Sequence, residues 1–70
     1  MTGLGLFLSK RSVNKAEISR KTGISKSRIT QLSNNLSTKL TAEELYKIAL
    51  SINVNPCDLL KEIFKEITLS

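Results

Sequence analysis

Signals for the start of a helix recur along this sequence, and they constrain its fold more than any other feature. Asn14, Ser25, Thr41 and Asn55 each precede a stretch of helix-forming residues, which is the position that N-cap side chains occupy. The third residue after Asn14 and after Thr41 is a glutamate, the arrangement of a capping box, and a proline follows Asn55 directly. These signals predict helices near 3–11 and at 15–22, 26–34, 42–52 and 56–68.

Helix ends and hydrophobic spacing agree with these starts. Gly23, Asn35 and Asn53 are the predicted helix ends, because glycine and asparagine tolerate a left-handed backbone. Apolar residues three and four positions apart give the predicted helices one buried face. The expected core comprises Ala16, Ile18, Ile29, Leu32, Leu45, Ile48, Ala49, Ile52, Leu59, Leu60, Ile63, Phe64 and Ile67. The pattern predicts an all-α fold, a compact five-helix domain that spans residues 1–70.

The composition argues against several classes of site. The chain has one cysteine, Cys57, and no histidine, so neither an intramolecular disulfide nor a Cys/His zinc site can form. We expect no metal, no cofactor and no enzyme, because no nucleophile–base pair or phosphate-binding glycine loop stands out. No apolar run is long enough for a membrane span, and Lys10 and Arg11 follow the apolar N-terminal residues rather than precede them. We therefore expect a cytoplasmic protein.

Charge is distributed unevenly along the chain. Residues 1–40 contain eight lysines and arginines but one acidic residue, whereas residues 41–70 contain three basic and five acidic residues. A basic half of this kind favours a polyanion as the binding partner.

The stretch 15–32 has the design of a helix-turn-helix. Gly23 suits the sharp turn, Ile24 fills its inner side, and Ser25 caps the second helix. Ser19 is small, which allows the two helices to approach each other. Ile29 and Leu32 lie three residues apart and hold the second helix against the core, so its opposite face is free to enter a major groove.

With these residues in place, the sequence resembles the Cro/repressor-type helix-turn-helix family (phage repressor-like, xenobiotic-response-element type). The resemblance covers about residues 13–60, including the turn at 23–25, the pair Ile48 and Ala49, and the segment 53–60. It implies a DNA-binding regulator of transcription whose recognition helix is 26–34. By this resemblance, Lys26, Ser27 and Gln31 read base edges, and Arg28 reaches a base or a phosphate. The implied phosphate contacts are Lys15, Asn34, Asn35, Thr38 and Lys39.

The sequence departs from the family at several points. Many members pair an arginine in the first helix with a glutamate at the end of the recognition helix, and the matching residues here are Leu8 and Ser33. We expect Leu8 to pack into the core instead. Asn35 replaces the usual glycine after the recognition helix. The loop before the fourth helix is one or two residues longer than usual.

Two questions about partners stay open at this point. Leu6, Phe7, Phe64, Ile67 and Leu69 exceed what one small core needs, so they either cover the core between the first and last helices or form a dimer contact. We expect a repressor that binds double-stranded DNA as a homodimer. The alternative is a DNA-binding antitoxin or adaptor subunit whose C-terminal helix binds a protein partner.

Overall fold

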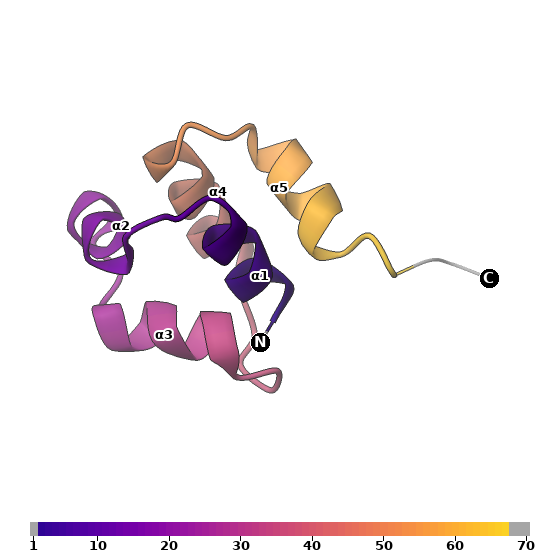
Figure 1. Ribbon diagram of the computed structural model, residues 1–70, viewed down its shortest axis with the longest axis horizontal. Helices are drawn as coiled ribbons and strands as arrows, with labels where there is room; N and C mark the ends of the chain where they lie inside the picture. The colour runs from indigo at the N-terminus through magenta and orange to yellow at the C-terminus, as the bar shows by residue number, and fades with distance from the viewer. Residues whose placement is uncertain (1, 68–70) are drawn as a thin grey trace.

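The computed structural model describes residues 2–67, and within this range every regular element is a helix. The five helices are α1 (Gly3–Lys10), α2 (Lys15–Thr22), α3 (Lys26–Asn34), α4 (Ala42–Ser51) and α5 (Pro56–Ile63). Figure 1 shows α2 and α3 at one end of the molecule and α5 at the other, with α1 and α4 between them. The all-α, five-helix prediction is confirmed.

The predicted N-caps are in place. Ser25 Oγ accepts a hydrogen bond from the backbone N–H of Arg28 at 3.1 Å, and the Asn14 and Asn55 side chains each accept one from the second residue of their helix. Thr41 forms a complete capping box with Glu44. The capping box predicted for Asn14 is wrong, because the Glu17 carboxylate accepts hydrogen bonds from Arg20 one turn later.

The helix ends differ more from the predictions. Gly23 (φ 79°) and Asn53 (φ 57°) have the expected left-handed backbone, but Asn35 is extended at φ −104° and ψ 111°. The left-handed end predicted at Asn35 is therefore wrong. The end predicted for the last helix is also wrong, because α5 ends at Ile63. Ile67 is 70% exposed, and short helices depend on packing of their apolar face, which the residues after Ile63 lack.

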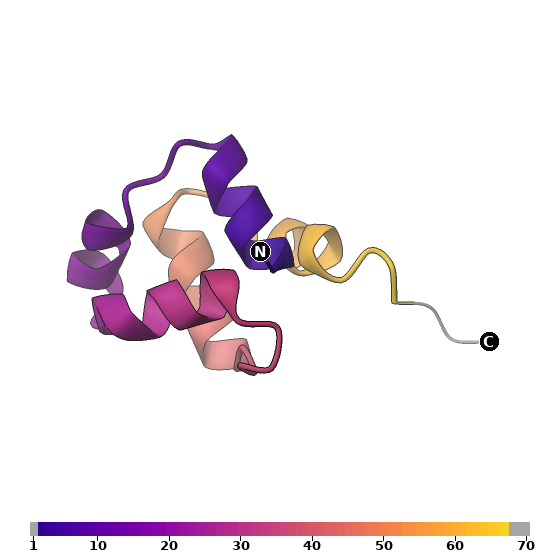
Figure 2. The same cartoon turned by 60° about the horizontal axis from the view of Figure 1, so that its bottom comes forward.

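The helices form a closed ring of contacts around the core. α1 packs on α3, α3 on α2, α2 on α4, α4 on α5, and α5 on α1, and Figure 2 shows α1 beside both α3 and α5. Every helix contributes to the buried set, which comprises Leu4, Leu8, Ile18, Ile29, Leu32, Leu45, Ile48, Ala49 and Leu59. Four predicted core residues, Ala16, Leu60, Phe64 and Ile67, are exposed instead. Ala16 and Leu60 lie on the side of their helix away from the ring, and Phe64 and Ile67 come after the last residue of α5.

The ring closes where the start of α1 meets the end of α5. A Cβ atom at Gly3 would lie 2.9 Å from the carbonyl oxygen of Ile63, so this close approach requires glycine. None of the helices in residues 2–67 is both long and apolar enough to cross a membrane.

Candidate nucleic-acid interface

The turn between α2 and α3 is held by side-chain hydrogen bonds as well as by glycine. The N–H of Gly23 donates to the carbonyl of Ser19 at 2.9 Å, and Ser19 Oγ donates to the carbonyl of Ile24 at 2.6 Å. Thr22 Oγ1 accepts from the N–H of Ile24 at 3.1 Å. Ser19 is thus both small and a hydrogen-bond donor, and the angle between the two helices is fixed at their junction.

The recognition helix has one buried and one exposed face. Ile29, Leu32 and Ser33 are buried against the core. On the opposite side four exposed residues line one shallow surface hollow: Lys26, Ser27, Thr30 and Gln31. The structure therefore brings together three of the residues expected to read bases. Thr30 was not predicted, although its spacing of four from Lys26 and three from Ser27 places it on the same helical face.

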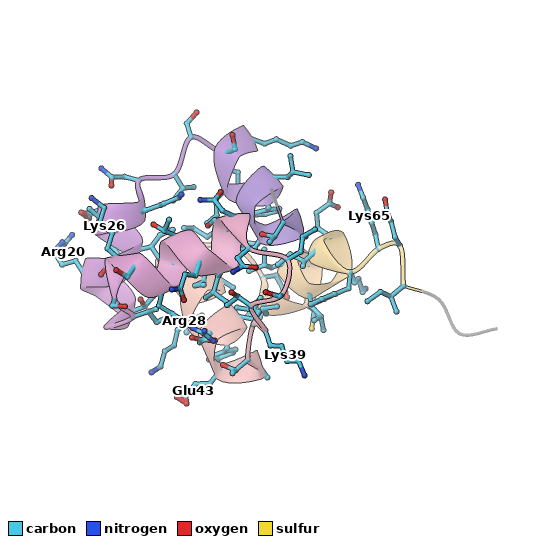
Figure 3. All side chains as sticks on the ribbon, turned by 90° about the horizontal axis from the view of Figure 1, so that it is seen from below. Arg20, Lys26, Arg28, Lys39, Glu43 and Lys65 are labelled. Carbon is cyan, nitrogen blue, oxygen red and sulfur yellow. The ribbon has the colours of Figure 1, made fainter. Side chains whose placement is uncertain are left out.

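Arg28 behaves differently from its neighbours on α3. Its Nε donates to Glu44 Oε2 at 2.8 Å and its Nη2 to Glu44 Oε1 at 3.1 Å. The same Nη2 donates to the carbonyl of Lys39 at 2.9 Å. Figure 3 shows Arg28 on the side of α3 that faces α4, away from Lys26.

This contact strongly lowers the pKa of Glu44. The hydrogen bonds from Arg28 lower the pKa of the Glu44 carboxyl from its ordinary value of 4.5 to about 2, against the opposing effect of burial. The N–H and hydroxyl of Thr41 each donate to Glu44 Oε1 at 3.0 Å and contribute to the same shift. Glu44 therefore stays ionised at neutral pH, held by both α3 and its own helix cap.

The residues expected to contact phosphate lie on two sides of α3. Lys15 and Asn34 line one hollow where α1, α2 and α3 meet. Thr38 and Lys39 lie in the loop toward α4, and both line a hollow there. The Asn35 side chain accepts from the N–H of Ser37 at 3.0 Å and from its hydroxyl at 2.7 Å, so it shapes the loop.

The C-terminal end of α3 is anchored by a residue that the sequence did not suggest. Thr2 Oγ1 donates to the carbonyl oxygens of Leu32 at 2.7 Å and of Ser33 at 2.9 Å. The Thr2 N–H donates to the same Ser33 carbonyl at 2.9 Å. The same hydroxyl accepts from the N–H of Gly5 as the N-cap of α1 at 3.0 Å. One threonine thus caps α1 and fixes the end of the recognition helix.

The two departures at Leu8 and Ser33 are explained by the packing between α1 and α3. Leu8 is 2% exposed, as expected for a core residue. Ser33 is buried as well, and its hydroxyl donates to the carbonyl of Ile29 at 2.8 Å. Both residues fit without an unpaired buried charge, and Thr2 supplies a polar contact between α1 and α3.

The basic half of the chain keeps most of its charge free of carboxylates. Among the described residues, Arg20 pairs with Glu17 and Arg28 with Glu44. The other ion pairs of this range, Lys47 with Glu43 and Lys65 with Glu62, lie on α4 and around the end of α5. Six basic residues in 10–39 therefore have no carboxylate partner within 2–67: Lys10, Arg11, Lys15, Lys21, Lys26 and Lys39.

These features together describe a helix-turn-helix with an exposed, polar and basic recognition face. The sequence matches a family model for the Cro/C1-type HTH DNA-binding domain over residues 4–65. The chain belongs to this family. Comparisons with curated proteins and with solved structures found no match. As a Cro/C1-type domain, the protein is a DNA-binding regulator, and its partner is double-stranded DNA.

The apolar residues left in question by the sequence, Leu6, Phe7, Phe64 and Ile67, line one hollow where α1 meets the end of α5. Phe7 is partly buried against the core, and Arg11 lies over its ring at 5.2 Å. Leu6 is 51% exposed, Phe64 39% and Ile67 70%. α1 and α5 are adjacent, yet these three side chains remain open to solvent. Leu69 lies outside the described residues.

Proposed function

We propose that this Cro/C1-type domain is a sequence-specific transcriptional repressor that inserts α3 into the major groove of its operator. The observation that carries the proposal is the polar face of α3, which stands exposed directly opposite the anchors Ile29 and Leu32. Occupation of a promoter is sufficient for repression by a domain of this size.

The side chains on this face suit base edges. Gln31 can pair with adenine through both the N–H and the C=O of its side-chain amide, Lys26 can donate to the acceptors of guanine, and Ser27 can bond to either base. Because Arg28 is bound to α4, we leave it out of the proposed base-reading set. Lys15, Asn34, Thr38 and Lys39 flank α3 and are proposed to contact phosphates, with Asn35 shaping the loop that carries the last two.

The first test is selection of bound duplexes from a random pool, followed by variants on the selected site. Lys26→Ala and Gln31→Ala should each weaken binding by about 1–3 kcal/mol and relax discrimination, because each removes contacts to bases. Lys15→Ala should weaken all sequences alike and reduce the salt slope by about 1, because it removes a phosphate contact. Lys21→Ala, which removes a charge from the side of α2 next to α4, is the matched control and should change little. Full affinity in all three test variants would refute the assignment of the face.

We further propose that the repressor binds as a homodimer through α1 and the end of α5. The supporting observation is the exposed apolar set of Leu6, Leu60, Phe64 and Ile67. Lys61 and Lys65 alternate with Glu62 and Glu66 in the same segment. A rim that carries both charges can pair with the same rim of a second copy related by twofold symmetry. Phe7 is proposed as a contact at the edge of this set.

Light scattering coupled to size-exclusion chromatography tests the dimer. The wild type should elute at twice the mass of one chain, and Ile67→Lys should elute as a monomer that remains folded. A monomeric wild type would refute the homodimer and favour the antitoxin or adaptor alternative, in which a different protein covers the same surface.

A further inference from the structure

The ion pair between Arg28 and Glu44 joins the recognition helix to α4. The two side chains come from residues 16 positions apart in sequence and meet through two charge-assisted hydrogen bonds at 2.8 and 3.1 Å. A third bond from Arg28 to the carbonyl of Lys39, at 2.9 Å, ties the loop between the helices to the same guanidinium. This fork arrangement is among the stronger forms of ion pair because both partners are planar and aligned.

Glu44 is itself held rigidly. Its Oε1 atom accepts from the backbone and hydroxyl of Thr41, so the carboxylate belongs to the first turn of α4. Its side chain is 17% exposed, whereas that of Arg28 is 34% exposed. A free Arg28 would therefore stand at the border of the recognition face with access to solvent, and the partly buried carboxylate of Glu44 holds its guanidinium in place.

We propose that Glu44 is a specificity-determining residue, which binds Arg28 against α4 and withholds this cation from the phosphate backbone of DNA. An arginine that reaches phosphates adds the same affinity on every sequence, because phosphates carry no base information. While Arg28 is bound to Glu44, a larger share of the binding free energy comes from the base-reading side chains, which distinguish one DNA sequence from another. The inference rests on the proposed function, since it requires that α3 faces DNA.

The test compares Glu44→Gln with Glu43→Gln. Both replace one glutamate of the first turn of α4 with its neutral amide, so both change the net charge equally. Glu43 is 72% exposed and pairs with Lys47 at 3.5 Å, so it leaves Arg28 untouched. Figure 3 shows Glu43 and Arg28 on the same side of the molecule, which makes the control a close one.

Binding to a mixed-sequence duplex is measured by fluorescence anisotropy between about 50 and 200 mM salt. Glu44→Gln should bind this duplex more tightly than wild type, and the slope of log affinity against log salt should steepen by about 0.9, the value for one additional phosphate contact. Its preference for the selected operator over the mixed duplex should fall. The double variant Arg28→Met/Glu44→Gln should return the slope to that of wild type, because the released cation is gone.

Three results would overturn the inference. Equal slopes for Glu44→Gln and wild type would show that Arg28 stays withheld without the carboxylate. Equal changes in Glu44→Gln and Glu43→Gln would show an effect of net charge alone. A slope in the double variant as steep as in Glu44→Gln would show that the additional contact is not made by Arg28. Helical circular dichroism of each variant at the assay temperature establishes that it is folded, and failure of wild type to bind any duplex would refute the proposed function separately.

Discussion

Replacing Thr2 with valine removes a hydroxyl that serves two helices at once. Valine keeps the β-branched shape of threonine, so the change isolates the hydrogen bonds from the packing. The lost N-cap bond to Gly5 is worth about 1 kcal/mol. The lost donor to the carbonyls of Leu32 and Ser33 is worth about 1 kcal/mol more. Thr2→Val should therefore lower the free energy of unfolding by about 2 kcal/mol.

Thermal and urea unfolding followed by circular dichroism measure this loss. In a domain of this size, about 2 kcal/mol corresponds to a fall in Tm of about 10 °C. Thr2→Ser is the matched control, since it retains the hydroxyl and should remain within about 0.5 kcal/mol of wild type. The reasoning is refuted if Thr2→Val is as stable as wild type. It is also refuted if Thr2→Ser loses as much stability as Thr2→Val, because the missing methyl group and not the hydroxyl would then be responsible.

Three further predictions concern stability. Gly3→Ala should destabilise the domain by about 1–3 kcal/mol, because the new methyl meets the Ile63 carbonyl at 2.9 Å. Gly23→Ala should cost about 1 kcal/mol through backbone strain at φ 79°, since the space around it is open. Urea titration checks both, and it contradicts the account of Gly3 if alanine there is stabilising. The lowered pKa of Glu44 implies stability that is present above pH 4.5 and is lost as the pH falls toward 2. At neutral pH, the free energy of unfolding of wild type should exceed that of Glu44→Gln by about 1–2 kcal/mol, after allowance for the partial exposure of the pair. This difference should vanish between pH 4.5 and 2, and a difference that stays constant with pH would refute the lowered pKa of Glu44.

The sequence was sufficient to predict features that depend on neighbours in the chain. The caps at Ser25, Thr41 and Asn55 and the turn at Gly23 involve atoms within a few residues, so residue type and spacing determined them. The burial of Ile29 follows from the helical period in the same way. These local signals placed the recognition helix and the side of it that is free.

Features that depend on the tertiary arrangement were missed. Thr2 meets the end of α3 across about 30 residues, and no local pattern marks it as the residue that anchors α3. The sequence offered Arg28 as a DNA contact, because its partner Glu44 becomes visible only when α4 is placed beside α3. The end of α5 was misplaced for a related reason: the apolar spacing continues to Ile67, but the surface on which it would pack does not.

The closed ring of helix contacts has a consequence for how the domain folds. Four of its five contacts, α1 with α3, α3 with α2, α2 with α4 and α4 with α5, join helices at modest distances in sequence. Contacts of this kind form rapidly. The fifth joins Gly3 to Ile63, about 60 residues apart, and it carries the largest entropic cost of closure. We expect the contact between α1 and α5 to form last on folding and to open first in native-state hydrogen exchange. The proposed dimer surface lies across this same contact, so association of two chains would also stabilise the contact between α1 and α5 within each chain.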